Sequence, residues 1–424
     1  MLGEPVPDRL RLDREFANRI MFTFNAPFSS RIRVMSKAVV RTSWIDNLRS
    51  FLTVLVVAHH SSLAYTTFAK FDKANYMSST APVVDNSRWI VMDVFEGFND
   101  IFFMSLMFLV SGIFFYRSIA KKGRRKFLSD RLLRLGLPFV IVVTLIMPLA
   151  YYPSFYLAEQ RKGFAAFIHD FIFHQHWPAG PCWFIWVLLS FNLLAAIIPL
   201  HWFTSAHSAL LKLAQKPFRF LSLFFVLAAL AYVPLSLKVG QYTWTAIGPF
   251  AFQLNRILLY FLFFLFGCCI GTSDWEDQFF TGTKMLKQSA VRWVVLSIVC
   301  FFSFGFYAGL AQDLVKTGKL DRETADFIFS LLFVGSCIAS SLAFIAVFRK
   351  RINASGKWWK SLSANAYGIY LVHYIFVNWI QFVLLSVPVQ DFVKFALVFL
   401  GALLLSWLII EQIRKTVWVN RLIG

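Results

Sequence analysis

The sequence predicts an all-α, polytopic membrane protein with about ten transmembrane helices. The first reason is composition: 58% of the 424 residues are hydrophobic, 15% are charged, and the mean hydropathy is +0.62. The second reason is that apolar stretches long enough to cross a bilayer recur along the chain. The third is that connections rich in Lys and Arg alternate with connections poor in them, as in multi-pass proteins.

The apolar stretches are joined by connections that leave no room for a large soluble domain. The longest outer connection, at roughly 153–181, contains a Phe-rich segment at 164–173 that predicts an amphipathic helix on the membrane surface. In chain order, the expected spans are 48–67, 93–116, 132–152, 182–201, 219–237, 250–271, 292–311, 326–348, 362–386 and 393–413.

The most basic connection is 117–134, and the positive-inside rule makes it cytoplasmic. The same rule places both termini in the cytoplasm, and the expected location is the inner membrane of a bacterium. Residues 1–34 differ in character from the rest of the chain, and Met35 resembles an ordinary start, so they are either a disordered extension or a misassigned start. The predicted parts are a basic cytoplasmic extension at 1–40, a transmembrane domain at 41–415 and a cytoplasmic tail at 416–424.

The net charge of +20 raises the question of a nucleic-acid partner. The basic residues follow the membrane topology rather than one folded face, which argues against nucleic acid and for contact with membrane lipids. The five cysteines form no C-x-x-C pair and have no metal-ligand spacing. We interpret them as core-filling residues, and we predict no metal site and no permanently bound cofactor.

Two polar side chains that are costly in hydrocarbon, Arg49 and His60, lie in the first apolar stretch. Their offset is about three helical turns, which puts them within roughly 20° of one face and about 16 Å apart along the axis. The predicted topology places Arg49 at the cytoplasmic surface and His60 near the midplane. Asp46 precedes Arg49 by three residues and can pair with it.

A neutral imidazole at this depth can act as a general base and then return the proton. The alternative for His60 is a hydrogen-bonded packing residue, and its alignment with Arg49 favours the functional interpretation. His59 is about 100° away around the helix and is expected to face elsewhere. His373 is predicted to reach a similar depth, either in a polar cavity with His60 or bonded within the bundle.

Arg131 and Arg134 open the third stretch at the end of the most basic connection. Two guanidinium groups at this spacing can converge on phosphates or a carboxylate. The alternative is that both residues only anchor the helix at the cytoplasmic surface.

On the predicted outer side, Asp93, Glu96 and Asp100 share one helical stripe. They can bind hydroxyl groups of a sugar or orient a catalytic histidine, or they can be the solvated start of a helix.

The outer connection carries His169, His174 and His176, but the H-x-H pair lacks a suitably spaced third metal ligand. Contacts to the surface or to an acceptor are therefore favoured over a metal. Trp183, further along the chain, is another candidate on the acceptor side.

The chain has no G-x-S-x-G elbow, no P-loop, no G-x-G-x-x-G and no H-x-x-x-x-D of soluble glycerolipid acyltransferases. It does contain five motifs in order, and together they resemble the acyltransferase-3 family of membrane-bound O-acyltransferases over about Arg41 to Arg414. The opening Trp44-Ile-Asp-Asn-Leu-Arg49 and the Gly-Pro-Cys-Trp-Phe segment are most similar to the branch with the glucan succinyltransferases. The five motifs are Arg49-x10-His60, Phe108-Leu-Val-Ser-Gly-Ile113, Arg131-x2-Arg134, Cys182-Trp-Phe-Ile-Trp186 and Tyr367-Gly-Ile-Tyr-Leu-Val-His373.

The resemblance implies a ten-helix enzyme that moves an acetyl- or succinyl-type group from cytoplasmic acyl-CoA, a co-substrate, to a hydroxyl of an extracytoplasmic carbohydrate or similar acceptor. It implies that His60 and Arg49 form the catalytic pair, with His60 as base or as acyl carrier. We add Asp46 and His373 as supporting residues. Arg131 and Arg134 match the family's arginine motif and are expected to bind acyl-CoA.

One position departs from the family pattern, because some relatives have a Glu where this chain has Val187-Leu-Leu-Ser-Phe-Asn192. Two other classes of function remain open from the sequence. A transporter or flippase of an envelope precursor is one, although no internal repeat is visible. A non-catalytic partner in envelope glycan assembly is the other.

Overall fold

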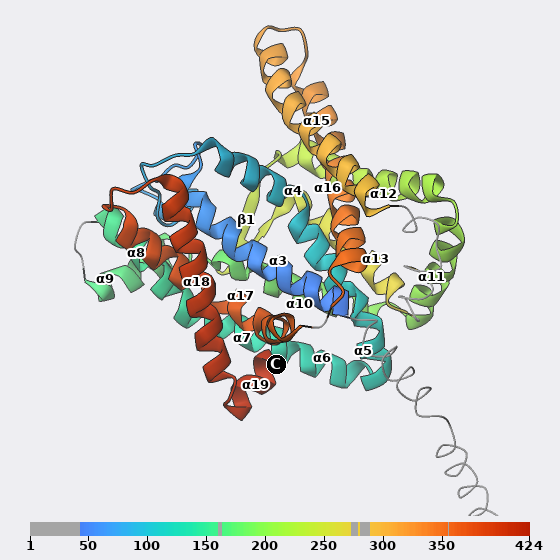
Figure 1. The fold of residues 1–424 in the computed structure, drawn as a ribbon, viewed down its shortest axis with the longest axis horizontal. Helices are drawn as coiled ribbons and strands as arrows, with labels where there is room; N and C mark the ends of the chain where they lie inside the picture. Colours follow the sequence, from blue (N-terminus) through green and yellow to red (C-terminus); the bar gives the residue numbers. More distant parts are fainter. Residues whose placement is uncertain (1–42, 160–162, 273–278, 280–288, 355) are drawn as a thin grey trace, which may run out of the picture.

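The structure, a computed structural model, confirms an all-α, multi-pass integral membrane protein (Figure 1). In the part of the chain that it describes, eight helical segments are long and apolar enough to cross a membrane. The expected extension at 1–40 lies outside the described residues, and the cytoplasmic placement of both termini stays a prediction. The described residues are 43–159, 163–272, 279, 289–354 and 356–424.

Each of the eight segments overlaps one expected span. The two remaining expected spans, 48–67 and 250–271, form helices that are more polar or shorter: α3 (Ser43–Ser62) and α13 (Ile257–Ile270). The eight segments are Ile90–Lys122, Arg124–Ala158, Gly180–Ile197, Pro217–Val239, Ala290–Lys316, Arg322–Arg351, Lys357–Leu384 and Asp391–Ile413.

Five of these segments are single helices, and the others are composite. The third span contains two π-helical turns, Leu132–Gly136 and Val142–Ile146, of the kind that often occurs at functional sites. The helices are α4 (Ile90–Ile113), α5 (Phe115–Lys122), α6 (Arg124–Arg131), α7 (Leu137–Ile141), α8 (Met147–Glu159), α10 (Trp183–Ile197), α12 (Pro217–Val239), α15 (Ala290–Lys316), α16 (Arg322–Arg351), α17 (Lys357–Leu384) and α18 (Asp391–Ile413).

The outer connection forms α9 (Phe164–His169) and a π-helical turn at Asp170–His174, which agrees with the expected surface helix. Two helices were not expected: α11 (Leu200–Ala214), between α10 and α12, and α19 (Val417–Ile423), in the predicted tail.

Asp321 caps the start of α16 by accepting a 2.8 Å hydrogen bond from the backbone nitrogen of Thr324. This hydrogen bond holds the pKa of the Asp321 carboxyl below its usual range.

The start of the expected span 250–271 is not helical, and this part of the expectation is wrong. Strands β1 (Trp244–Ile247) and β2 (Phe250–Gln253) form an antiparallel hairpin, and a 3₁₀ turn at Leu254–Arg256 leads into α13. Gly248 has a φ of 56°, which the tight turn requires. A short apolar run is compatible with either strand or helix, so hydrophobicity alone did not separate the two.

The first helix, α3, lies at the centre of the bundle and packs between α4 and α17 (Figure 1). Leu48, Leu52 and Val56 repeat at helical spacing and are buried. Val57 is buried in a second apolar cluster on another side of α3, so the polar side chains of α3 are presented to neighbouring helices rather than to lipid.

Helices α4 and α13 approach each other closely through glycines near their C-terminal ends. A Cβ added at Gly112 would lie 2.2 Å from the Phe264 carbonyl oxygen, and one at Gly267 would lie 2.2 Å from the Leu109 carbonyl oxygen. Small residues of this kind let membrane helices pack backbone to backbone.

We expect Gly112→Ala to lower the free energy of unfolding by about 1–3 kcal/mol, because the new methyl group would push against backbone that cannot move away. Gly97 lies on the same helix with open space around its Cβ position, so Gly97→Ala is the matched control. Thermal unfolding of the detergent-solubilised protein measures both. Equal melting temperatures for the two variants would contradict the close packing of α4 on α13.

Candidate functional site

His60 and His373 meet between α3 and α17. His60 Nδ1 lies 2.9 Å from the Val56 carbonyl oxygen and 3.3 Å from His373 Nε2. His373 Nδ1 lies 2.7 Å from the Tyr370 carbonyl oxygen, and the His373 side chain is fully buried. The structure therefore brings together the two histidines that the sequence placed at similar depth.

The hydrogen bonds assign the proton positions of the neutral pair. A carbonyl oxygen only accepts, so His373 Nδ1 donates to Tyr370 and its Nε2 carries a lone pair. That lone pair and the Val56 carbonyl oxygen both face His60 Nδ1, which must then be the protonated nitrogen. His60 Nε2 is left unprotonated, which is the state that a general base requires.

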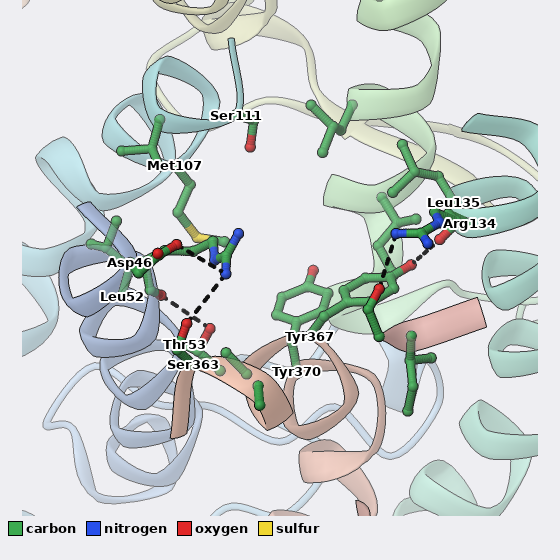
Figure 2. Close-up of a pocket in the computed structure, with 18 of the residues that line it drawn as sticks. Asp46, Leu52, Thr53, Met107, Ser111, Arg134, Leu135, Ser363, Tyr367 and Tyr370 are labelled. Atoms are coloured by element: carbon green, nitrogen blue, oxygen red, sulfur yellow. Dashed lines mark hydrogen bonds and ion pairs between the residues drawn. The ribbon is translucent and has the colours of Figure 1, made fainter. Parts of the chain in front are cut away.

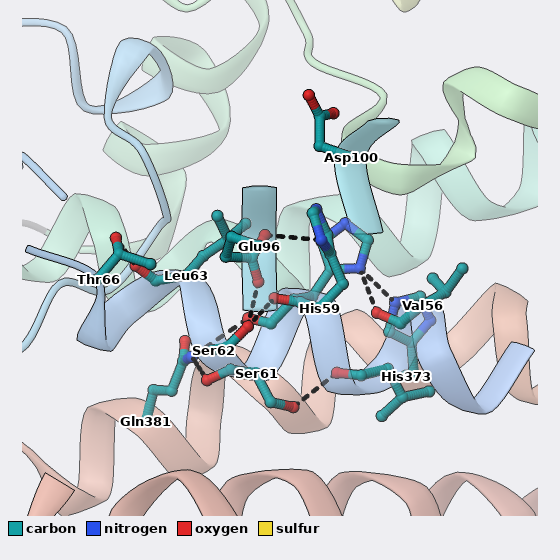
Figure 3. A network of polar contacts seen from close by, with 12 residues as sticks. Val56, His59, Ser61, Ser62, Leu63, Thr66, Glu96, Asp100, His373 and Gln381 are labelled. Atoms are coloured by element: carbon teal, nitrogen blue, oxygen red, sulfur yellow. Dashed lines mark hydrogen bonds and ion pairs between the residues drawn. The ribbon is translucent and has the colours of Figure 1, made fainter. Parts of the chain in front are cut away.

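His59 faces α4 and pairs with a buried carboxylate. Its Nδ1 lies 2.6 Å from Glu96 Oε2, and Ser62 Oγ donates to the other carboxylate oxygen of Glu96. The His59 ring also lies 5.3 Å from the His60 ring, centroid to centroid. Figure 3 shows Glu96, His59 and His373 gathered along α3. Two ionisable pairs thus meet at one level of the bundle.

The three acids of the α4 stripe have three different partners. Asp93 accepts from the backbone nitrogen and the hydroxyl of Thr67, which fixes the turn after α3. Asp100 Oδ2 forms a 2.6 Å ion pair with Arg256 Nη2, and the Asp100 carbonyl oxygen accepts from Arg256 Nη1 at 2.8 Å. Glu96 and Asp100 therefore form ion pairs with residues of neighbouring elements, whereas Asp93 holds the turn after α3.

A cavity of about 640 Å³ opens on the opposite side from these acids, at the end of α3 that carries Arg49. Figure 2 shows Asp46, Thr53 and Ser363 on one wall and Tyr367 with Arg134 on the other. Its cationic lining residues are Arg49, Arg131, Arg134, Lys360 and Arg414. The sequence motifs that were expected to bind acyl-CoA thus share one pocket with the first-helix arginine.

The arginines of the pocket are positioned by neighbouring groups. Arg49 Nη2 lies 3.4 Å from Asp46 Oδ1 and 3.3 Å from Ser363 Oγ. The Arg131 guanidinium lies over the Phe127 ring at 4.9 Å, and Arg134 Nη1 donates to the Gly424 carbonyl oxygen at 2.9 Å. Within the described residues, no Asp or Glu side chain forms an ion pair with Arg131 or Arg134.

The pocket reaches toward the histidine pair along two helices. Tyr370 lines the pocket, and its carbonyl oxygen is the one that holds His373. Thr53 also lines the pocket and precedes His60 on α3 by about two helical turns, or about 10 Å. Neither histidine lines the cavity, but α3 and α17 each carry a lining residue within about two helical turns of its histidine.

His174 and His176 line neither the pocket nor the contact between His60 and His373. His176 is exposed and has a positive φ of 56°, and His174 Nδ1 lies 3.5 Å from Asp170 Oδ1. The structure describes no group of three His, Cys, Asp or Glu side chains that could hold a metal ion, within the residues searched. Trp183 packs against the rings of Trp244 and Tyr260, at 5.4 Å and 5.9 Å.

Two functional candidates were missed from the sequence, His59 and Arg256. Arg256 is a lone arginine between apolar runs, and an intramembrane charge is itself a signal that the sequence offered. His59 lies in the same apolar stretch as His60, but only the packing of α3 on α4 shows that it meets Glu96.

The fold and the site define a multi-pass membrane protein with ionisable groups in the bundle and a cation-lined pocket. A family model described as an acyltransferase domain, Acyl_transf_3, matches residues 42–411, and the chain belongs to this family of membrane-bound acyltransferases. The expected family and enzyme class are confirmed.

Curated relatives carry the name glucans biosynthesis protein C. The proteins from Salmonella schwarzengrund (strain CVM19633) and Salmonella agona (strain SL483) are each 25% identical over 350 residues, which are 79% of this chain and 74% of the relative. No solved structure matches the chain.

We expect Asp100→Asn to lower the free energy of unfolding by about 3 kcal/mol, because it leaves the buried Arg256 guanidinium without its counter-charge. Asp93→Asn is the control, since the amide retains an oxygen that can accept from Thr67. Thermal unfolding in detergent compares the two. Equal loss in both variants would show that Arg256 does not depend on the Asp100 charge.

Proposed function

We propose that this acyltransferase moves an acetyl- or succinyl-type group from cytoplasmic acyl-CoA to a hydroxyl of an extracytoplasmic glycan, in a bacterial inner membrane. The observation that supports the proposal most is that the cation-lined pocket lies next to the His60–His373 pair along α3 and α17. Family membership favours group transfer over the transporter or flippase alternative.

The donor end of the site suits a nucleotide thioester. Arginine forks bind phosphate oxygens in pairs, and Arg131 and Arg134 line the pocket without an ion pair to an Asp or Glu side chain in the described residues. Arg134 has five N–H donors, so its bond to Gly424 leaves others for a ligand. A volume of about 640 Å³ lies within the usual range for small-molecule sites.

The proposed chemistry is alcoholysis of a thioester. His60 Nε2 removes the proton from the acceptor hydroxyl while the hydroxyl oxygen bonds to the thioester carbonyl carbon. The C–S bond then breaks, and His60 returns the proton to the leaving thiolate. Arg49, on the same face of α3, guides the thioester arm, and Asp46 and Ser363 hold its guanidinium.

His373 acts on this reaction through His60. When His60 takes up a proton at Nε2, its Nδ1–H keeps two acceptors, the Val56 carbonyl oxygen and His373 Nε2. Both acceptors stabilise the imidazolium that forms in the transition state. His373 is therefore a positioning and stabilising residue rather than the base itself.

The acceptor class rests on the relatives, which are named for glucan biosynthesis. A glucan presents hydroxyl groups, which is what a base at Nε2 of His60 would act on. We therefore propose a glucan or a similar carbohydrate as the acceptor.

We expect Arg131→Ala and Arg134→Ala each to raise the KM for acyl-CoA about tenfold or more, because a charge-assisted hydrogen bond contributes about 1.5–3 kcal/mol. Initial rates with the purified protein in proteoliposomes measure this. The exposed Lys212 of α11 gives the control variant Lys212→Ala.

Acyl-pantetheine, which lacks the nucleotide phosphates, makes the test specific. With this donor the arginine variants should behave like the unmodified protein. The same loss with both donors would contradict phosphate binding by Arg131 and Arg134.

We expect His60→Ala to lower kcat by about 10²–10⁴-fold, because general acid–base catalysis typically contributes that much. Transfer of label from acetyl-CoA or succinyl-CoA to glucan oligosaccharides measures the effect. His201→Ala, at an exposed histidine of α11, is the control. Full transfer by both His60→Ala and Arg49→Ala would refute the catalytic assignment.

A further inference from the structure

The sixth expected span is built differently from the others. Helix α13 has 14 residues, which is about 21 Å of helix, whereas the hydrocarbon core is about 30 Å thick. The β1–β2 hairpin and the 3₁₀ turn at Leu254–Arg256 make up the difference on the outer side. The outer half of this span is therefore not helical.

Two contacts place the hairpin at membrane depth rather than above the membrane. Trp186 Nε1 donates to the Ala251 carbonyl oxygen at 2.7 Å, and Trp186 lies inside the spanning segment Gly180–Ile197. The Phe250 ring lies 5.6 Å from that of Phe139, which is inside the third span. Non-helical backbone at this depth is tolerated where protein covers it or where it lines a water-filled cavity.

The Asp100 carboxylate is only partly covered by protein. Asp100 lies near the middle of α4, yet its side chain is 37% exposed, whereas the paired Arg256 side chain is 2% exposed. Figure 3 shows Asp100 beyond His59, away from α17. A partly exposed carboxylate on a spanning helix requires a polar neighbour on its open side.

Exposed aromatic rings lie next to Arg256, the partner of this carboxylate, and on the hairpin. The Arg256 guanidinium lies 5.9 Å from the Tyr242 ring, and Tyr242 is 64% exposed. Trp244 is 51% exposed and meets Trp183 at 5.4 Å with an interplanar angle of 89°. Two indoles at right angles form a corner, and flat aromatic faces stack on the C–H faces of sugar rings.

Buried polar atoms around the ion pair remain without partners. Asn255 Oδ1, Arg256 Nε and Asn99 Nδ2 are each buried and have no hydrogen-bond partner. An unpaired buried polar atom is costly, so such a group indicates a missing ligand or water. One acceptor and two donors match hydroxyl groups, which both donate and accept.

We propose that the hairpin, Trp183 and Asp100 form the binding site for the acceptor glucan chain. Tyr242, Trp244 and Trp183 stack on its sugar rings, and Asp100 accepts from its hydroxyl groups. This inference rests on the proposed function and names the acceptor site of the same reaction. Glu96 lies one helical turn before Asp100 and binds His59, and the His59 ring contacts the ring of His60. These contacts connect the proposed acceptor site to the proposed base.

The test is binding of a fluorescently labelled β-glucan oligosaccharide to the full chain in detergent, without any acyl donor. We expect Trp244→Ala and Tyr242→Ala each to weaken binding by about tenfold, or about 1.4 kcal/mol, because each variant loses a stacking ring. Trp244→Phe retains a ring and should recover most of the affinity. Trp202 of α11 is similarly exposed, so Trp202→Ala is the matched control.

Unchanged binding in Trp244→Ala and Tyr242→Ala, or an equal loss in Trp202→Ala, would overturn the inference, as would no binding by the unmodified chain. Either result would indicate that Tyr242 and Trp244 face lipid instead of a glucan. Because this assay has no acyl donor, it separates the inference from the proposed function. Binding that depends on Trp244 without acyl transfer would support the site and reject the reaction.

Discussion

The cost of placing ionisable side chains in hydrocarbon governs the arrangement of this bundle. Each such group near mid-depth has a partner on another element: His60 with His373, His59 with Glu96, and Asp100 with Arg256. These pairs join α3 to α17, α3 to α4, and α4 to the turn before α13. Since breaking any pair would leave a group unsatisfied in a low-dielectric interior, the same contacts that hold the chemistry also fix the helices.

The two ends of the site differ in the chemistry they present. The pocket at the Arg49 end is lined by guanidinium groups, which suit phosphates, whereas the Asp100 end combines a carboxylate with exposed aromatic rings, which suits a carbohydrate. His60 lies between them on α3. In the proposed reaction, this difference between the two ends would let each substrate reach the base from its own side of the membrane without crossing the bilayer.

Helical periodicity was enough to predict some of the site from sequence. Arg49 and His60 lie on one face of a continuous helix, and Arg131 and Arg134 face a common pocket from one turn. Contacts that depend on packing could not be derived, because nothing local to α3 indicates that Glu96 will meet His59. The hairpin was missed since a four-residue apolar strand next to an apolar helix has the same hydropathy as one long span.

Charge balance distinguishes the two acyl groups within the proposed reaction. The acceptor proton ends on the CoA thiol inside while the acyl group ends on the glycan outside. For an acetyl group this exchange moves no net charge across the membrane. A succinyl group also carries its free carboxylate outward, so one negative charge crosses per turnover. With the interior negative, that movement is favoured by about 2.3 kcal/mol for each 100 mV. Membrane potential would therefore drive succinyl transfer outward and leave the acetyl transfer equilibrium unchanged.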